Sequence, residues 1–170
     1  MTARPFNVLI LCTGNSARSI LGEALIGHWG QGRFRGFSAG SQPKGRVHPL
    51  ALDLLEHEGL AIEGLRSKSW EEFAAADAPP LDFIFTVCDN AAGEACPVWP
   101  GHPMTVHWGI DDPAAVKGTD AEQRQAFRKA FDELQRRVRA FIDLPIDSLD
   151  PRELKQRLEA IGKSRTTEAA

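Results

Sequence analysis

The segment that decides the fold is CTGNSARS, residues 12–19. It follows an almost continuous apolar run over residues 6–11, which is typical of a central strand covered on both faces. After it, apolar residues recur with helical spacing over residues 18–29, and Gly30 and Gly32 end the pattern. The sequence therefore predicts a strand, a tight loop and a helix, with Cys12 at the carboxyl end of the strand.

Strands and helices alternate along the rest of the chain. Further strands are predicted over residues 34–38, 82–87 and 104–108. One helix is predicted over residues 49–58. Two more are predicted to begin at capping boxes at 69–72 and 119–122, and a fourth at an N-cap and first-turn proline at 150–151. The last two helices carry apolar stripes: Phe127, Phe131, Leu134, Val138 and Phe141 on the first, and Leu154, Leu158 and Ile161 on the second. This alternation indicates a parallel sheet wrapped by helices.

Length and composition narrow the functional classes. The chain has 170 residues, of which 42% are hydrophobic and 25% charged, as expected for one globular domain. A net charge of −3 does not favour a nucleic-acid partner, and no run approaches the roughly 18 apolar residues that span a bilayer. Strand-like residues begin almost at once, which leaves no room for a signal peptide, so we expect the cytoplasm. Three cysteines in that compartment are expected to be thiols.

The loop after the first strand has the chemistry of an oxyanion site. Arg18 provides a planar fork for two oxygens, and the positive end of the following helix adds to it. Cys12 at the floor of such an electropositive cup should lose its proton easily and act as a nucleophile, with Ser19 donating a hydrogen bond to the sulfur. Small residues between them allow backbone N–H groups to form an anion nest: Thr13, Gly14, Asn15, Ser16 and Ala17. The alternative is a buried, inert cysteine beside an ordinary surface arginine.

This loop, placed directly after a strand, resembles the phosphate loop of the low-molecular-weight protein tyrosine phosphatase fold family. That family includes phosphatases and the arsenate reductases coupled to thioredoxin. The resemblance implies an α/β three-layer sandwich with a central four-stranded parallel sheet, and here an extra C-terminal helix. We predict a phosphatase-like domain over residues 1–144 and a helical extension with a loose tail over 145–170.

A second motif is HWGIDDP, residues 107–113, which follows the last predicted strand. Parallel strands end at one edge of a sheet, so this segment should lie beside Cys12. A carboxyl group there can protonate the oxygen that leaves the central atom. Family members carry Asp-Pro at this place, and the motif resembles the reductase version. We therefore predict Asp112, next to Pro113, as the general acid in preference to Asp111; the alternative is a simple turn.

The two remaining cysteines are Cys88, at the end of a predicted strand, and Cys96, eight positions later. The reductase resemblance implies a relay: Cys12 binds arsenate, Cys88 attacks Cys12 and releases arsenite, and Cys96 carries the disulfide outward. Alternatives are a core role for Cys88 with an incidental Cys96, or a zinc site with His102 and His107.

The substrate and the electron donor depend on the resemblance. Phosphatases of this fold usually follow Asp-Pro with tyrosine, whereas Ala114 follows here and the chain has no tyrosine. This favours arsenate, with phosphate or sulfate as mimics, although a phosphatase or a non-catalytic oxyanion sensor stays open. No organic cofactor is expected; electrons would come from thioredoxin, or from glutaredoxin and glutathione. Some relatives bind potassium, and Asn15, Glu23 and Ser38 stand where its ligands are found, but no further carboxylate is evident near residues 67–70.

Overall fold

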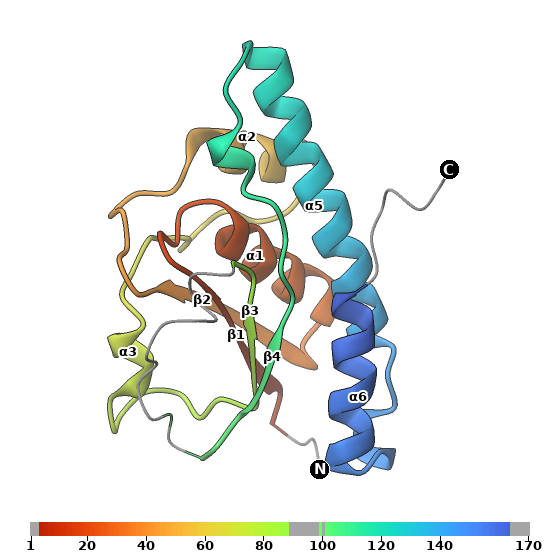
Figure 1. The fold of residues 1–170 in the computed structure, drawn as a ribbon. Helices are drawn as coiled ribbons and strands as arrows, with labels where there is room; N and C mark the ends of the chain where they lie inside the picture. Colours follow the sequence, from red (N-terminus) through yellow and green to blue (C-terminus); the bar gives the residue numbers. More distant parts are fainter. Residues whose placement is uncertain (1–3, 89–98, 100, 164–170) are drawn as a thin grey trace.

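The computed structural model describes residues 4–88, 99 and 101–163, and its centre is a parallel sheet (Figure 1). The strands are β1 Phe6–Cys12, β2 Phe34–Gly40, β3 Phe83–Thr86 and β4 Met104–His107. Their order is β2-β1-β3-β4, and every neighbouring pair is parallel. The chain leaves β1 for β2 on one side and later returns to β3 on the other. The carboxyl end of β1 is therefore a topological switch point, where ligands bind in open α/β sheets.

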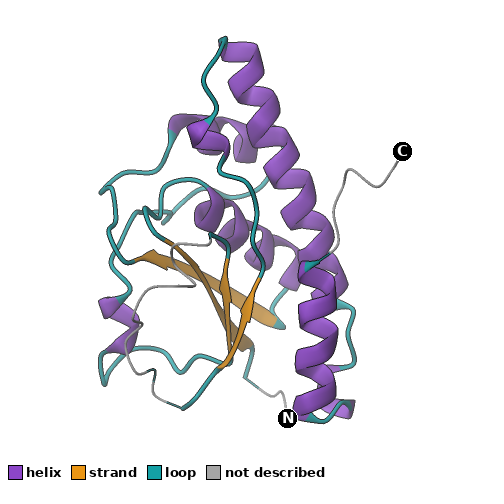
Figure 2. Cartoon of the chain, viewed as in Figure 1, coloured by secondary structure: helices purple, strands orange, loops and turns teal. Residues whose placement is uncertain are grey.

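Alternation along β1 separates the two faces of the sheet. Val8 and Ile10 belong to a large cluster with the helices, which are α1 Arg18–Gly30, α2 Pro49–His57, α5 Asp120–Ile142 and α6 Pro151–Gly162. Leu9 and Leu11 point to the opposite face, which the short helix α3 Glu71–Ala74 and nearby loop residues cover (Figure 2). Because both faces are covered, the central strand is apolar throughout, as its sequence predicted.

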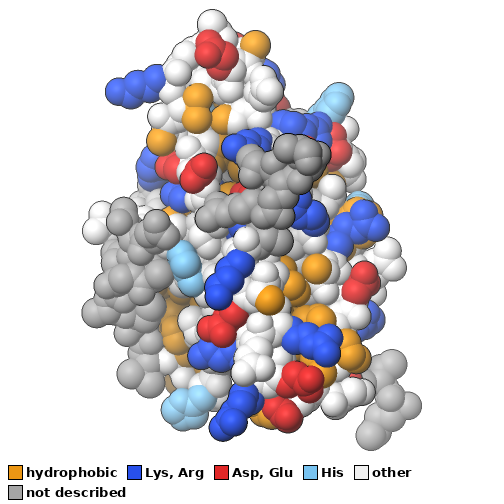
Figure 3. Space-filling view, turned by 45° about the vertical axis from the view of Figure 1, so that its right-hand side comes forward, with side chains coloured by type: hydrophobic (Ala, Val, Ile, Leu, Met, Phe, Trp, Pro, Cys, Tyr) orange, Lys and Arg blue, Asp and Glu red, His pale blue; other side chains and the backbone are white. Residues whose placement is uncertain are grey.

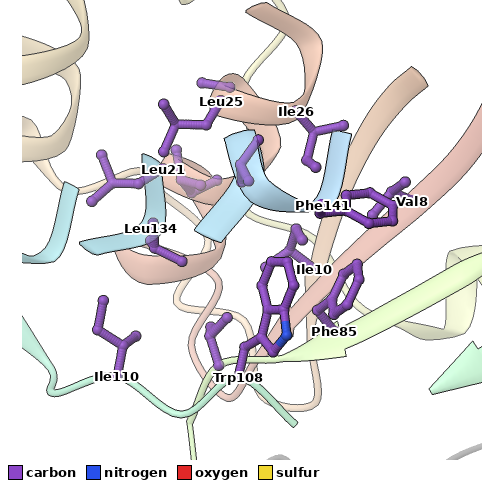
Figure 4. Close-up of a cluster of buried hydrophobic side chains, with 14 of the residues drawn as sticks. Val8, Ile10, Leu21, Leu25, Ile26, Phe85, Trp108, Ile110, Leu134 and Phe141 are labelled. Carbon is purple, nitrogen blue, oxygen red and sulfur yellow. The ribbon is translucent and has the colours of Figure 1, made fainter. Parts of the chain in front are cut away.

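The larger cluster joins the sheet to the two helices that support the carboxyl edge. Figure 4 shows Ile10 of β1 and Phe85 of β3 grouped with Leu21 of α1 and Phe141 of α5. Trp108, just beyond β4, is fully buried in this group and stacks on Phe85 with ring centroids 3.8 Å apart. The second residue of the predicted acid motif is thus fixed by the core.

The predicted strands and helices are confirmed, with one error at a helix start. At α5, Thr119 and Glu122 form the predicted capping box, each side chain accepting from the other residue's backbone N–H at 3.1 Å. The predicted box at residues 69–72 does not form: α3 begins after Trp70, which provides no side-chain cap. Ser69 Oγ accepts from Glu71 N at 3.2 Å rather than from Glu72 N, and the Glu72 side chain pairs with Arg66 at 2.6 Å instead of reaching back to Ser69.

The C-terminal helix packs closely on the rest of the fold. Asp150 caps α6 as predicted, accepting from Glu153 N at 2.9 Å. Leu154 and Leu158 are buried, and Trp108 Nε1 donates to the carbonyl oxygen of Leu158 at 2.9 Å. The helix therefore contacts the second motif itself, through Trp108. The division of the chain at residue 144 stays a prediction.

The surface carries mixed charge rather than one sign. On the face drawn in Figure 3, basic and acidic side chains are interspersed and hydrophobic areas are small. Such a face does not favour a polyanionic partner. Among the described helices, none has both the length and the apolar character needed to cross a bilayer.

Candidate active site

The loop after β1 turns its carbonyl groups outward. Thr13 O accepts from Gln42 N, Gly14 O from Lys44 N and Ser16 O from His48 N, each at 2.9 Å. In a trans peptide the N–H points away from the C=O, so the N–H groups of the same peptide units face the other way, toward the inside of the loop. The segment after β2 therefore orients the predicted anion nest.

Asn15 holds the loop in a strained shape. Its φ is 46°, in the left-handed region that residues other than glycine rarely adopt. The fully buried side chain donates to Ser19 Oγ at 2.8 Å and to Ser38 Oγ at 3.0 Å, and its Oδ1 accepts from Lys68 N at 2.8 Å. Ser19 accepts from Asn15, so its own hydroxyl proton is available to another acceptor. The predicted donation to Cys12 fits this arrangement and stays a prediction.

A cavity of about 420 Å³ lies over the loop. Its described lining comprises Cys12, Thr13, Gly14, Ser16, Ala17, Arg18, Gln42, Pro43, Lys44, Asp112 and Ala114. Two of these side chains, Arg18 and Lys44, are cationic. Arg18 Nε is buried and has no hydrogen-bond partner among the described residues, which makes it a donor that a bound anion could satisfy.

The two predicted motifs meet at this cavity. Arg18 Nη1 donates to Ile110 O at 3.0 Å, and Nη2 lies 3.5 Å from Asp112 Oδ2. The other carboxylate oxygen, Asp112 Oδ1, accepts from Ala114 N at 2.9 Å. Asp112 therefore lines the cavity over the loop, whereas Asp111 lines neighbouring hollows, to which Asp112 also contributes. This geometry agrees with choosing Asp112, and its role as acid stays a prediction.

Cys12 and Cys88 are both buried, and their side chains lie within hydrogen-bond contact. Thr13 Oγ1 also lies 3.4 Å from Cys88 Sγ. The pKa of the Cys12 thiol is raised, first by the hydrogen bond with Cys88 and then by burial; Arg18 and the backbone N–H of Gly14 oppose this. The neighbouring sulfur thus opposes the negative charge of Cys12 while Arg18 and the Gly14 N–H favour it, and the easy ionisation of Cys12 stays a prediction.

Two further predictions for this region concern Cys96 and a zinc site. Cys96 lies outside the described residues. For the zinc alternative, no group of three or more histidine, cysteine or acidic side chains that could hold a metal occurs among residues 4–88, 99 and 101–163. His107 Nδ1 lies 2.8 Å from Thr86 Oγ1, and His102 is exposed.

The matches to known proteins agree with this geometry. Residues 7–158 match the family described as low molecular weight phosphotyrosine protein phosphatase. The chain belongs to this family. It is 35% identical over 141 residues to the arsenate reductase of Halalkalibacterium halodurans, covering 80% of this chain and 94% of that protein.

Solved structures within the family show the same architecture. An arsenate reductase in the phosphate-binding state matches with a TM-score of 0.61 and 27% identity, over 81% of this chain and 96% of that one. An arsenate reductase in the oxidized state matches with a TM-score of 0.65 and 26% identity, over 80% and 95% of the two chains.

The potassium ligands predicted from the family do not fit an ion here. Ser38 Oγ donates to Glu23 Oε1 at 2.5 Å, and Asn15 uses both ends of its amide within the loop network. The ammonium group of Lys68 lies 3.7 Å from Glu23 Oε1. A buried cation of the protein thus lies beside the one carboxylate of the set, where a second cation would be repelled.

Several functional positions were missed at the sequence level. Gln42, Pro43 and Lys44 line the cavity, and a signal was present: they directly follow the end of the second strand, at the same sheet edge as Cys12. Lys68 lies within the stretch in which we looked for a carboxylate. Only its burial reveals its role, and no local pattern predicts burial of a lysine.

Proposed function

We propose that this protein reduces arsenate to arsenite, using Cys12 as the nucleophile. One observation carries the proposal: a second buried cysteine, Cys88, lies in contact with Cys12, and Cys12 lines the cavity over the loop. Hydrolysis of a phosphate ester needs one sulfur, whereas a two-electron reduction by thiols needs two. The curated relative at 35% identity is an arsenate reductase, which supports the same activity.

The first step would join Cys12 to arsenic. Arg18 and the inward N–H groups hold the oxygens of the tetrahedral anion, and the Cys12 thiolate attacks As(V). An arsenic–oxygen bond breaks, and Asp112 donates a proton so that the oxygen departs as water. The 3.5 Å contact between Arg18 Nη2 and Asp112 Oδ2 supports this pairing of roles, because it holds the carboxyl group beside the arginine.

The second step would reduce arsenic. Cys88 gives up its proton and attacks the sulfur of Cys12, forming a disulfide between them. The electron pair of the Cys12 S–As bond moves to arsenic, so As(V) becomes As(III) and arsenite leaves. Two thiols are oxidised to one disulfide, which balances the two electrons gained.

The last steps would restore the thiols. Cys96 attacks Cys88, which releases Cys12 and leaves a Cys88–Cys96 disulfide for an external dithiol to reduce. We propose thioredoxin as that dithiol, because the cycle ends with a protein disulfide rather than a mixed adduct with a small thiol. A reducing compartment is required, which favours the cytoplasm.

The cavity wall supports a small inorganic substrate. None of its described lining residues is aromatic, and Ala114 lies where an aromatic side chain would hold an aryl group. Arsenate, phosphate and sulfate are all tetrahedral oxyanions, so phosphate and sulfate should compete for the same site.

Arsenate-dependent oxidation of NADPH, coupled through thioredoxin and its reductase, tests the proposal. Cys12→Ser, Cys88→Ser and Cys96→Ser should each abolish turnover. An enzyme that hydrolyses a small aryl phosphate equally well after Cys88→Ser, and does not turn over arsenate, would be a phosphatase. If Cys96→Ser still turned over arsenate with glutathione and glutaredoxin, these two would be the electron donors in place of thioredoxin.

A further inference from the structure

We propose that the ammonium group of Lys68 takes the place of a bound monovalent cation beside the oxyanion loop. Lys68 is then a positioning residue, and the protein does not depend on potassium. The inference rests on the proposed role of the loop as an oxyanion site, but its main test does not require arsenate turnover.

The contacts of Lys68 show a side chain that is built into the fold. Only 6% of it is exposed, which is rare for lysine. Its ammonium group donates to the carbonyl oxygen of Arg66 at 2.8 Å and lies 3.7 Å from Glu23 Oε1. A hard monovalent cation such as potassium also binds to oxygen ligands, so the ammonium group has the surroundings that such an ion would have.

A chain of hydrogen bonds connects this charge to the loop. Glu23 accepts from Ser38 Oγ at 2.5 Å, and Ser38 in turn accepts from Asn15 Nδ2 at 3.0 Å. Since the Ser38 proton points to the carboxylate, its lone pairs face Asn15. The same Asn15 amide also donates to Ser19 Oγ at 2.8 Å. The positive charge of Lys68 therefore favours Ser38 as donor to Glu23 and Asn15 as donor to Ser38, and this chain of hydrogen bonds ends at Ser19, where the loop meets α1.

The backbone of Lys68 ties the same segment to the loop a second time. Lys68 N donates to Asn15 Oδ1 at 2.8 Å, and Lys68 O accepts from Gly40 N at 2.9 Å. The Asn15 side-chain amide is thus held at Oδ1 by the backbone of Lys68 and at Nδ2 by Ser38, which bonds to the Glu23 carboxylate beside the Lys68 ammonium group. Losing the ammonium charge should loosen Asn15 and with it the anion nest.

Burial sets the cost of leaving either charge alone. It lowers the pKa of Lys68 and raises the pKa of Glu23, and in each case the partner's charge opposes the shift. Glu23 without Lys68 would be a buried carboxylate in need of a cation. Removing the lysine should therefore create the cation requirement that the wild-type protein lacks.

The first experiment compares wild-type protein in potassium, sodium and choline chloride at equal ionic strength. We expect the midpoint of thermal unfolding and the Kd for inorganic phosphate to be the same in all three salts. A wild-type midpoint that rises in potassium relative to choline would overturn the proposal, whatever the activity of the enzyme.

The second experiment removes the charge. Lys68→Met, of similar size, should lower the unfolding midpoint by roughly 5–10 °C and weaken phosphate binding roughly tenfold, with no rescue by salt. Lys68→Ala leaves room for an ion, so about 100 mM potassium should raise its midpoint by roughly 2–5 °C over choline. The matched control is Lys155→Met, an exposed position on α6, which should behave as wild type.

The kinetic prediction separates positioning from a merely structural role. In Lys68→Met the KM for arsenate should rise with the Kd for phosphate, while kcat changes by less than about threefold, since no reacting group is removed. If Lys68→Met had the same unfolding midpoint and the same Kd for phosphate as Lys155→Met, the proposed role of the Lys68 charge would be refuted. If wild-type protein bound no phosphate, the proposed function would fail, and the salt comparison of unfolding would still decide this inference. If Lys68→Met failed to fold, the wild-type comparison would decide it as well.

Discussion

Replacing Gly162 with alanine should test how α6 is docked. A Cβ at this position would lie 2.5 Å from Trp108 Cδ1 and 3.0 Å from the carbonyl oxygen of His107. The indole cannot move aside, because it is fully buried, stacks on Phe85 at 3.8 Å and donates to Leu158 O at 2.9 Å. The end of the helix must therefore shift away from the sheet.

The expected cost follows from three contributions. Overpacking costs about 1–3 kcal/mol, and loss of the indole hydrogen bond about 1 kcal/mol. The better helix propensity of alanine returns at most about 1 kcal/mol. The net loss is about 1–3 kcal/mol, which lowers the unfolding midpoint by roughly 2–12 °C for a chain of this size.

The same substitution elsewhere provides the control. Gly27 is an exposed residue inside α1, with no atom within 4 Å of an added Cβ. Gly27→Ala should raise the free energy of unfolding by up to about 1 kcal/mol, because only the propensity change acts there. Urea and thermal unfolding measure both variants. Our reasoning is refuted if Gly162→Ala is as stable as wild type or more so, because α6 would then not dock on Trp108.

Three further predictions concern the site. Cys88→Ala removes the largest cause that raises the pKa of Cys12, so alkylation of Cys12 by iodoacetamide, followed by peptide mass spectrometry, should begin at lower pH than in wild type. Asp112→Asn should slow single-turnover arsenate chemistry by about 10²–10⁴ while phosphate still binds, as calorimetry would show. Arg137→Met should cost about 3–5 kcal/mol in urea unfolding, because the fully buried guanidinium donates to the carbonyl groups of residues 108 and 109 at 3.0 and 3.1 Å.

Each of these predictions has an outcome that contradicts it. An unchanged alkylation profile would mean that Cys88 does not affect the charge of Cys12. If Asp112→Asn kept full activity, another residue would have to be the general acid. Arg157→Met removes an exposed arginine on α6 and is the control for Arg137→Met; equal stability of the two variants would show that the buried contacts contribute little.

The position of the loop and its chemistry follow from the order of the residues alone. An apolar run, small residues and an arginine at fixed spacing are local features, and local geometry is enough to place Cys12 at a strand end beside a helix N-terminus. The rule that parallel strands end at one edge then placed Cys88 in contact with Cys12 and Asp112 on the wall of the cavity that Cys12 lines. These inferences succeeded because each depends on neighbours in the chain or on one general property of sheets.

The features that depend on burial became visible only in the folded protein. Lys68 is far from Asn15 and Glu23 in sequence, and nothing in its surroundings marks it as a buried counter-charge. The hydrogen bond with Cys88 raises the pKa of Cys12, and α6 docks on Trp108 through buried leucines and the close approach of Gly162. In each case the energy comes from desolvation or close packing between distant segments, and such effects leave no periodic signal in the chain.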